Sequence, residues 1–343
     1  MKILVIGGTL FIGRVLVEKL RAAGHTVAVL HRKPTHDLGE DIESLTAERN
    51  DPEAVARALK RRNFDAVFDN VYDWTGGTNA EQVLSTARSA NTKHYVFMSS
   101  VAAYGSGDHC EEDRDLAPDG HPDLYVRNKA QSERALFDSG LPVTTLRPPF
   151  VYGPGNPFDR ETWFWRRFAD GRAVMVPGRG ERAMQFIHVE DLANCAILCL
   201  ENKQSIGQAF NVAGPPVSQL DFVKALAAAA QYETAIYGIP REEILHADGS
   251  AMGPAEKLYF AEYLDLPPIG QVIEKANRVL GFSARPLNDG LSQTHLVWKA
   301  KRQAAAPTAE MSGSLKWEAA TPYAWEDGLL SSGSRVLLAG GSR

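Results

Sequence analysis

The sequence predicts an α/β fold, in which a doubly wound parallel sheet is followed by a smaller lobe of mixed helices and strands. Short, nearly continuous apolar runs alternate with amphipathic stretches through the first half of the chain, as they do in a parallel sheet that helices cover on both faces. A glycine-rich turn directly follows the first apolar run. The alternation stops after Leu146, so a second architecture is expected from there on.

The first half of the chain gives the expected elements in order. Strands are expected at Ile3–Ile6, Thr26–Leu30, Ile42–Leu45, Ala66–Phe68, Tyr95–Met98 and Val143–Leu146, and helices at Phe11–Ala23, Pro52–Arg62, Ala80–Ala90 and Leu124–Ser139. Pro52 suits the start of its helix, because the first turn needs no N–H from that residue. Short strands separated by helices indicate repeated βαβ units.

The second half is less regular. Prolines and glycines crowd residues 148–157 and predict a loop. Helices are expected at Val189–Leu200, Phe222–Ala230 and Ile273–Leu280, a short strand at Ala209–Val212, and irregular structure over residues 236–270. We therefore expect one domain over residues 1–150, rejoined by about 183–205, a lobe formed mainly by 151–300, and a low-complexity tail over 301–343. Within that tail, the segment around Trp325 is expected to dock as a single turn.

Composition excludes several classes of protein. The 343 residues carry a net charge of −5, so there is no basic surplus for non-specific binding of nucleic acid. Three cysteines are too few for a disulfide framework. No apolar run reaches the length of about 18 residues that a membrane span needs. The N-terminal apolar run is too short for a secretory signal, and we expect a cytoplasmic protein.

The glycine turn points to a dinucleotide. Gly7 and Gly13 take the outer places of a G-x-x-G-x-x-G pattern, Leu10 takes the middle place, and Gly8 and Thr9 lie between. Such a turn brings backbone N–H groups, here those around Phe11 and Ile12, to a pyrophosphate at a helix N-terminus. A tight strand–helix turn without a ligand is the simpler alternative.

Basic residues end the second expected strand. His31, Arg32 and Lys33 stand where an acidic residue would bind the ribose hydroxyl of NAD. Because a basic residue there suits the 2′-phosphate of NADP, we expect NADP as the cofactor, with NAD as the alternative.

A tyrosine and a lysine lie one helical turn apart. Tyr125 and Lys129 share a helix face, and an ammonium beside a phenol lowers the pKa of that phenol. The tyrosine then exchanges a proton with a substrate hydroxyl or carbonyl near neutral pH. Ser99 and Ser100 close the fifth expected strand, at the edge where open α/β sheets bind ligands.

These motifs together resemble the extended short-chain dehydrogenases/reductases of the NAD-dependent epimerase/dehydratase family. The resemblance rests on five segments in order: the glycine turn, Ser100 with Tyr125 and Lys129, Arg147–Asn156, Gln185–Ala193 and Phe210–Gly214. It implies a Rossmann-type cofactor domain with a substrate lobe, and hydride transfer at a secondary alcohol or carbonyl of a sugar or polyol derivative. It also implies a homodimer through the helices at 80–90 and 124–139.

The resemblance assigns roles to single residues. Tyr125 would be the general acid/base, Lys129 would bind the nicotinamide ribose, and Ser100 would position the substrate oxygen. Further cofactor contacts would come from Ser99, from Pro148 after the sixth strand, and from Glu48 and Arg49 beside the adenine, where a solvated turn is the alternative. Asn156 would contact the substrate.

The sequence departs from the family at three places. Leu10 replaces the middle glycine, as in a subset that resembles chloroplast stem-loop-binding proteins. The segment Phe68–Asp73 replaces an H-x-A-A motif, so Tyr72 and Asp73 are expected in the substrate wall. Met184 stands where nucleotide-sugar enzymes carry a diphosphate-binding arginine, and Arg182 lies nearby as its possible substitute.

Three alternatives remain open. Trp163 lies in a segment of aromatic residues and arginines that either walls a substrate pocket or packs as a helix into the lobe. Two alternatives to this oxidoreductase are a nucleotide-sugar 4-epimerase or dehydratase, and an RNA-binding or scaffold protein that kept the fold. The acidity of the chain argues against nucleic acid. His188 and Asp191 lack a third ligand at metal spacing, so no metal site is expected.

Overall fold

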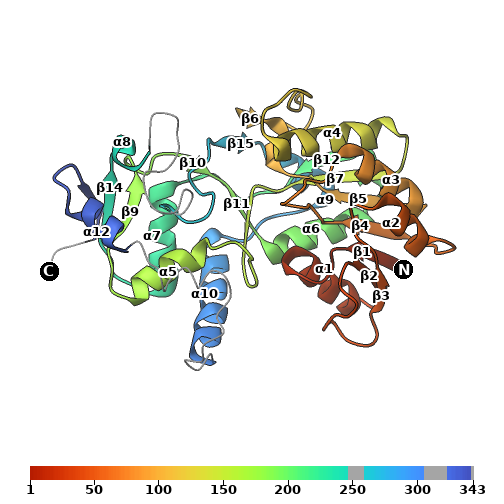
Figure 1. The fold of residues 1–343 in the computed structure, drawn as a ribbon, viewed down its shortest axis with the longest axis horizontal. Coiled ribbons are helices and arrows are strands. Elements are labelled where there is room, and N and C mark those ends of the chain that lie inside the picture. Colours follow the sequence, from red (N-terminus) through yellow and green to blue (C-terminus); the bar gives the residue numbers. More distant parts are fainter. Residues whose placement is uncertain (246–258, 305–322, 341–343) are drawn as a thin grey trace. The chain divides into compact units, whose positions relative to one another are not determined.

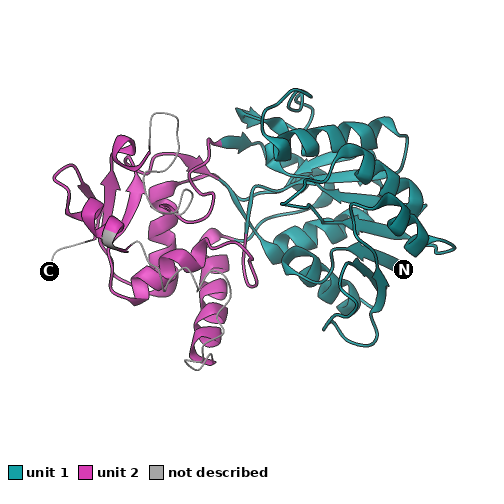
Figure 2. Ribbon diagram, viewed as in Figure 1, with its two compact units in different colours: residues 1–151, 185–215, 269–285 teal, residues 152–184, 216–268, 286–343 magenta. Residues whose placement is uncertain are grey.

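The computed structural model describes residues 1–245, 259–304 and 323–340. Within these ranges the chain forms two compact units (Figure 2): residues 1–151, 185–215 and 269–285 make the first, and the other described residues make the second. The first unit therefore recruits 269–285 as well as a segment near the one expected to rejoin it.

A seven-stranded parallel sheet forms the centre of the first unit. Its strands, in the order in which they lie side by side, are β12 (Gln208–Asn211), β7 (Val143–Arg147), β5 (Tyr95–Met98), β4 (Ala66–Asp69), β1 (Lys2–Ile6), β2 (Thr26–His31) and β3 (Glu43–Thr46). The sheet thus runs outward in both directions from β1 and β4, as in a doubly wound fold.

Helices cover both faces of this sheet (Figure 1). Ile3 and Val5 of β1 belong to a core formed with α1 (Phe11–Ala22), α6 (Val189–Glu201) and α9 (Glu274–Leu280). Leu4 and Ile6 belong to the opposite core, with α2 (Pro52–Leu59), α3 (Ala80–Ala90) and α4 (Leu124–Asp138). Because successive side chains of a strand point to opposite faces, an uninterrupted apolar strand serves both cores.

The helices α2, α3 and α4, which cover one face of the sheet, each begin at a polar residue whose side chain caps the helix. Asp51 caps α2 by accepting from the Ala54 N–H, and Pro52 follows it. Asn79 and Gln82 form a capping box at α3. Asp123 caps α4 by accepting from the N–H groups of Tyr125 and Val126, which fixes where the expected catalytic residues stand on that helix.

The second unit has a sheet of its own, with strand order β16-β14-β9. Its elements are α5 (Glu161–Ala169), β9 (Val174–Pro177), β10 (Ala183–Met184), β13 (Val217–Ser218), α7 (Gln219–Ala230), β14 (Ile236–Ile239), α8 (Arg241–Ile244), α10 (Leu287–Ala304), α12 (Tyr323–Ser331) and β16 (Val336–Ala339). The remaining elements of the described residues are η1 (Val101–Tyr104), β6 (Gly107–Cys110), β8 (Phe150–Tyr152), β11 (Phe186–His188), η2 (Lys203–Ser205) and β15 (Ile269–Gln271).

The described part of the expected low-complexity tail contains regular secondary structure. α10 reaches Ala304, α12 is a nine-residue helix rather than one turn, and β16 pairs antiparallel with β14. The region expected to be irregular, residues 236–270, contains β14, α8 and the start of β15. The loop expected over residues 148–157 contains β8. These elements were missed because they are short and gain their pairing from distant parts of the chain. Residues 305–322 and 341–343 of the expected tail lie outside the described residues.

Candidate active site

The turn after β1 has the backbone form of a phosphate-binding loop. Gly7 has φ +79°, and a Cβ on Gly13 would lie 2.0 Å from the Gly7 carbonyl oxygen. Only glycine at position 13 lets α1 approach the strand so closely. No acidic residue stands in the first turn of α1, so its positive end faces no carboxylate of its own helix. This turn, with Thr9, Phe11 and Ile12, fits the pyrophosphate of a dinucleotide.

Leu10 is compatible with this turn although it replaces a glycine. Its φ of −139° and ψ of 143° are ordinary extended values, and its side chain is 61 % exposed. The positive φ falls on the next residue, Phe11, at 43°. The backbone strain of the turn is therefore carried by a buried phenylalanine.

The end of β2 presents two cations. Arg32 and Lys33 are exposed, whereas His31 is buried and its Nε2 lies 2.8 Å from the Ser44 hydroxyl. Burial lowers the pKa of His31, and the charges of His36 and Lys33 lower it further. The charge available to a phosphate here thus resides on Arg32 and Lys33 near neutral pH.

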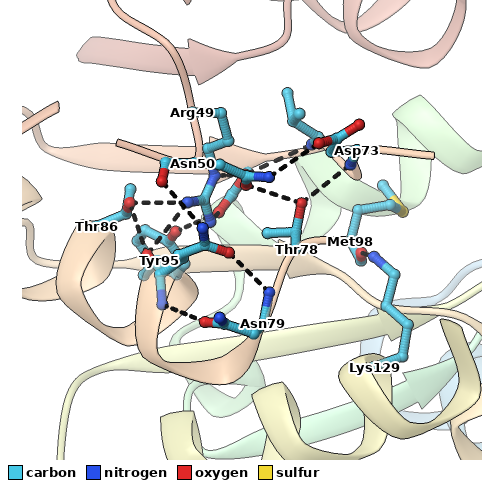
Figure 3. Close-up of polar contacts among 12 residues, drawn as sticks. Arg49, Asn50, Asp73, Thr78, Asn79, Thr86, Tyr95, Met98 and Lys129 are labelled. Atoms are coloured by element: carbon cyan, nitrogen blue, oxygen red, sulfur yellow. Dashed lines mark hydrogen bonds and ion pairs between the residues drawn. The ribbon is translucent and has the colours of Figure 1, made fainter. Parts of the chain in front are cut away.

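Arg49 does not reach toward a ligand. Its guanidinium is buried against Asp69 at the end of β4, with an Nη2–Oδ2 distance of 2.5 Å, and it also donates to the Thr86 hydroxyl and the Gln82 carbonyl. The sequence left open whether Arg49 contacts the adenine or lies in a solvated turn. In the structure its N–H groups instead bind Asp69 of the sheet and residues of α3 (Figure 3). Glu48 beside it is exposed.

Ser99, Ser100 and Pro148 lie at the carboxyl ends of neighbouring strands, β5 and β7. The Val101 N–H donates to the Pro148 carbonyl, and the Ser99 N–H donates to the Leu146 carbonyl. The Ser99 hydroxyl donates to Glu133, which is buried. The Ser100 hydroxyl accepts from the Ala102 N–H at 3.2 Å and so caps η1.

Tyr125 and Lys129 come together on α4 beside these serines. The Lys129 ammonium donates to the Met98 carbonyl at the end of β5, at 2.7 Å (Figure 3), and lies 5.8 Å from the centre of the Tyr125 ring. Burial lowers the pKa of Lys129 to about 8, opposed by the carboxylates of Asp69 and Glu133. Lys129 is thus a fully buried cation directed at the strand end, next to a half-buried phenol.

An aromatic cluster surrounds this pair. The ring of Tyr72 meets the Tyr125 ring edge-on at 4.7 Å, and the indole of Trp74 stacks on Tyr125 at 4.8 Å. The Asn128 amide donates to the Tyr72 hydroxyl at 3.2 Å. Trp74 and Asn128 were not among the predicted site residues, although each is close in sequence to one of them.

Asp73 has a structural role in the loop that carries Tyr72. Its carboxylate accepts from the Thr75 N–H at 2.9 Å and from the Asn50 amide at 3.2 Å. These contacts fold the loop on itself. Asp73 therefore shapes the wall beside Tyr125 through the position of its neighbours.

Three further candidates belong to the second unit and are engaged there. Asn156 donates to Glu161 at 3.1 Å and accepts from the Phe158 N–H. Trp163 has no exposed surface, so the expectation that it walls a pocket is wrong and the alternative of a packed helix holds. Arg182 donates to the backbone and side chain of Asp265.

The described residues contain no group of three or more histidine, cysteine, aspartate or glutamate side chains suited to hold a metal ion. None of the described helices combines the length and apolar character needed to cross a membrane.

Comparison with known proteins gives a family match and a set of similar folds. Residues 3–213 match the model of the NAD dependent epimerase/dehydratase family. The chain is 31 % identical to the chloroplast stem-loop binding protein of 41 kDa b of Arabidopsis thaliana, over 86 % of this chain and 78 % of that protein. It is 30 % identical to a (4-alkanoyl-5-oxo-2,5-dihydrofuran-3-yl)methyl phosphate reductase of Streptomyces griseus, over 62 % and 68 % of the two chains.

Among solved structures, the enzyme WbmG of Bordetella bronchiseptica, in complex with NAD and UDP, superposes with a TM-score of 0.71 at 19 % identity, covering 90 % of this chain and 98 % of that one. The UDP-glucose 4-epimerase of Thermotoga maritima superposes with a TM-score of 0.68 at 21 % identity, covering 88 % and 100 %. At these identities the likeness establishes the fold alone.

Proposed function

The chain belongs to the NAD dependent epimerase/dehydratase family, and on that premise we propose that it is an NADP-dependent oxidoreductase with Tyr125 as general acid/base. It transfers hydride to or from a secondary alcohol or carbonyl of a sugar or polyol derivative. The observation that carries the proposal is the buried Lys129 ammonium, held at the Met98 carbonyl and 5.8 Å from the Tyr125 ring.

This geometry supports proton transfer at the phenol. Below the pKa of about 8 that burial gives Lys129, its positive charge favours the phenolate form of Tyr125. Tyr125 then takes a proton from a substrate hydroxyl or gives one to a carbonyl. The Ser100 oxygen accepts from the Ala102 N–H, so we expect its O–H to donate to the same substrate oxygen.

The chain's own residues also define how the cofactor is held. The nicotinamide ring supplies the hydride acceptor or donor when it is bound. We assign the pyrophosphate to the turn from Gly7 to Gly13, the nicotinamide ribose to Lys129, and the adenine side to Glu48. The exposed Arg32 supports preference for NADP. Calorimetry with NADP and NAD tests this: in Arg32→Ala the preference for NADP is expected to fall about tenfold or more, and an unchanged preference contradicts the assignment.

The experiment that tests the proposed chemistry compares Tyr125→Phe with the wild type. Thermal shifts first identify the cofactor, and a panel of sugar and polyol alcohols and ketones then identifies a substrate through the absorbance of NADPH. Tyr125→Phe is expected to keep cofactor binding and to lose turnover by about a hundredfold or more. Turnover within a few fold of the wild type would refute the role of Tyr125.

A nucleotide-sugar 4-epimerase or dehydratase is the second candidate, favoured by the fold shared with the Thermotoga enzyme. Two features oppose it. Met184 is buried at the position expected for an arginine, and the nearby Arg182 pairs with Asp265, which Arg241 also binds. An arginine whose guanidinium is already held by a carboxylate and a backbone carbonyl has fewer N–H groups to offer a diphosphate. Binding of UDP at micromolar affinity in calorimetry would reverse this order.

A role in RNA binding is the third candidate, because the Arabidopsis relative is named a chloroplast stem-loop binding protein. The net charge of −5 opposes it. Filter binding to a stem-loop RNA at two salt concentrations distinguishes the candidates: retention with a steep salt dependence, without NADP binding, would favour RNA.

Two properties complete the proposal. We assign the protein to the cytoplasm, since all three cysteines are free and buried, as suits a reducing compartment. We also propose a homodimer through α3 and α4, which pack on one another within the chain. Light scattering on the purified protein tests the oligomer.

A further inference from the structure

The loop between β4 and α3 exposes a large aromatic side chain beside Tyr125. Trp74 is 61 % exposed, although its indole stacks on the Tyr125 ring with an angle of 27° between the planes. It also meets the edge of Tyr72 at 5.1 Å. Since exposed indoles are unfavourable in water, this exposure calls for a reason beyond packing.

The loop is held in place by hydrogen bonds from its surroundings (Figure 3). Asn50 donates to the Gly77 carbonyl at 2.8 Å and accepts from the Thr78 hydroxyl at 3.0 Å. The Thr78 hydroxyl also accepts from the Asp73 N–H, and the Gly77 N–H donates to the Asp73 carbonyl. The Gln82 amide fixes Asn50 in turn by donating to its carbonyl. Trp74 therefore projects from a preorganised loop.

We propose that Trp74, together with Tyr72, is a ring-stacking subsite that selects the substrate. The reacting carbon of the substrate belongs to, or is bonded to, a ring whose flat face lies against the indole. This inference rests on the proposed function, because the substrate oxygen must reach the hydroxyl of Tyr125. The exposed surface of an indole stacked beside that phenol can contact the neighbouring atoms of the same substrate.

The chemistry of this surface defines the class of ligand. Indoles bind flat groups through stacking and through contact with C–H bonds, so an aromatic ring and the C–H face of a pyranose both fit. An open chain of equal size gains less, because it must give up rotational freedom to lie flat. Neither kind of ring needs a nucleotide diphosphate.

Saturation-transfer NMR on the NADP-loaded protein tests the subsite. The probes form two matched pairs: methyl phenyl ketone against methyl hexyl ketone, and methyl glucopyranoside against sorbitol. In the wild type, the ring member of at least one pair is expected to bind about three- to tenfold more tightly than its open-chain partner. The pair that shows the preference identifies the ring as aromatic or sugar.

Two variants of Trp74 test whether its indole causes the ring preference. Trp74→Phe keeps an aromatic face and is expected to keep most of the ring preference, whereas Trp74→Leu keeps apolar bulk and is expected to lose it. Both should fold, since the side chain is largely exposed, and NADP binding checks this. Equal binding within both probe pairs in the wild type, or a ring preference that survives in Trp74→Leu, would overturn the inference.

The same measurement in Tyr125→Phe separates this inference from the proposed function. The phenylalanine ring preserves the stack under Trp74, so the ring preference is expected to persist while turnover is lost. If Tyr125→Phe keeps its turnover, the proposed acid/base role of Tyr125 fails, and the ring preference of the wild type and of Trp74→Leu still tests the stacking subsite. If turnover is lost and the wild type shows no ring preference, only the subsite fails.

Discussion

Replacing Glu326 by alanine should destabilise the second unit strongly. Glu326 lies in α12, and its carboxylate accepts from the Nε of Arg167 at 3.1 Å and from its Nη2. The side chains of Arg167 and Glu326 are 2 % and 4 % exposed. The guanidinium also lies 3.4 Å over the Trp163 ring and donates to the Trp163 carbonyl, so it has no route to water when its partner is removed.

The magnitude follows from this burial. Removing one partner of a buried ion pair leaves an uncompensated charge and costs about 3–5 kcal/mol. Asp327 provides a matched control on the same helix: it pairs with Arg172, but its side chain is 59 % exposed, so Asp327→Ala should cost less than about 1 kcal/mol.

Urea denaturation followed by tryptophan fluorescence measures both variants, because Trp163 and Trp165 are buried in the second unit. Equal unfolding free energies for Glu326→Ala and Asp327→Ala would refute the reasoning, because the buried ion pair of α12 would then contribute no more stability than the exposed one.

Three further predictions follow from the first unit. Gly13→Ala should abolish NADP binding in calorimetry and lower the melting temperature, because the new Cβ would meet the Gly7 carbonyl oxygen at 2.0 Å; retained binding would contradict the tight turn. Lys129 has a folded-state pKa of about 8, below its ordinary 10.5, so the folded protein binds fewer protons than the unfolded chain between these values and gains stability as pH rises through them. Urea titrations at pH values of about 8 and 10 measure the unfolding free energy, and Lys129→Met should lack the increase between them that the wild type shows. The same increase in both proteins would refute this origin of the pH dependence. Asn50→Ala should speed amide exchange over residues 70–79 by about tenfold, since the part-buried hydrogen bonds between its amide and the loop are worth about 0.5–1.5 kcal/mol each; unchanged exchange would show that the loop is held otherwise.

The fold of the first unit was predictable because its signals are local. The helix at Ala80–Ala90 and the strand at Tyr95–Met98 agree with the structure at both ends. Asn79 and Gln82 mark the start of that helix within four positions. Each such signal lies among neighbours along the chain, so it can be recognised in the sequence without knowledge of the tertiary contacts.

The second unit was less predictable because its partners are distant. Arg167 and Glu326 are separated by 159 positions, and β16 becomes a strand only against β14. Arg49 shows the same limit in the first unit, since nothing within its own segment marks Asp69 as its partner. Whether a charged side chain is buried is decided by tertiary contacts. A charged residue that the sequence suggests as a ligand contact can therefore be engaged in an internal ion pair instead.

The candidate site divides along the same line. The spacing of Tyr125 and Lys129 on one helix is a local property, and the structure has both on α4 as the spacing requires. The direction of the Lys129 ammonium, toward the Met98 carbonyl of another element, is not local. Neither is the stack of Trp74 on Tyr125, which joins a loop after β4 to a helix about fifty positions later. Sequence thus identifies residues capable of the chemistry, and tertiary structure decides what surrounds them.

Leu10 illustrates why a missing motif residue need not remove a function. A glycine is required where φ is positive or where a Cβ would collide, and position 10 meets neither condition, since its φ is −139°. An added Cβ would collide at Gly7, Gly8 and Gly13, and the positive φ values fall at Gly7 and Phe11. The turn therefore keeps the three glycines that its geometry demands, and the departure at the middle position places an exposed leucine beside the turn proposed to bind the pyrophosphate.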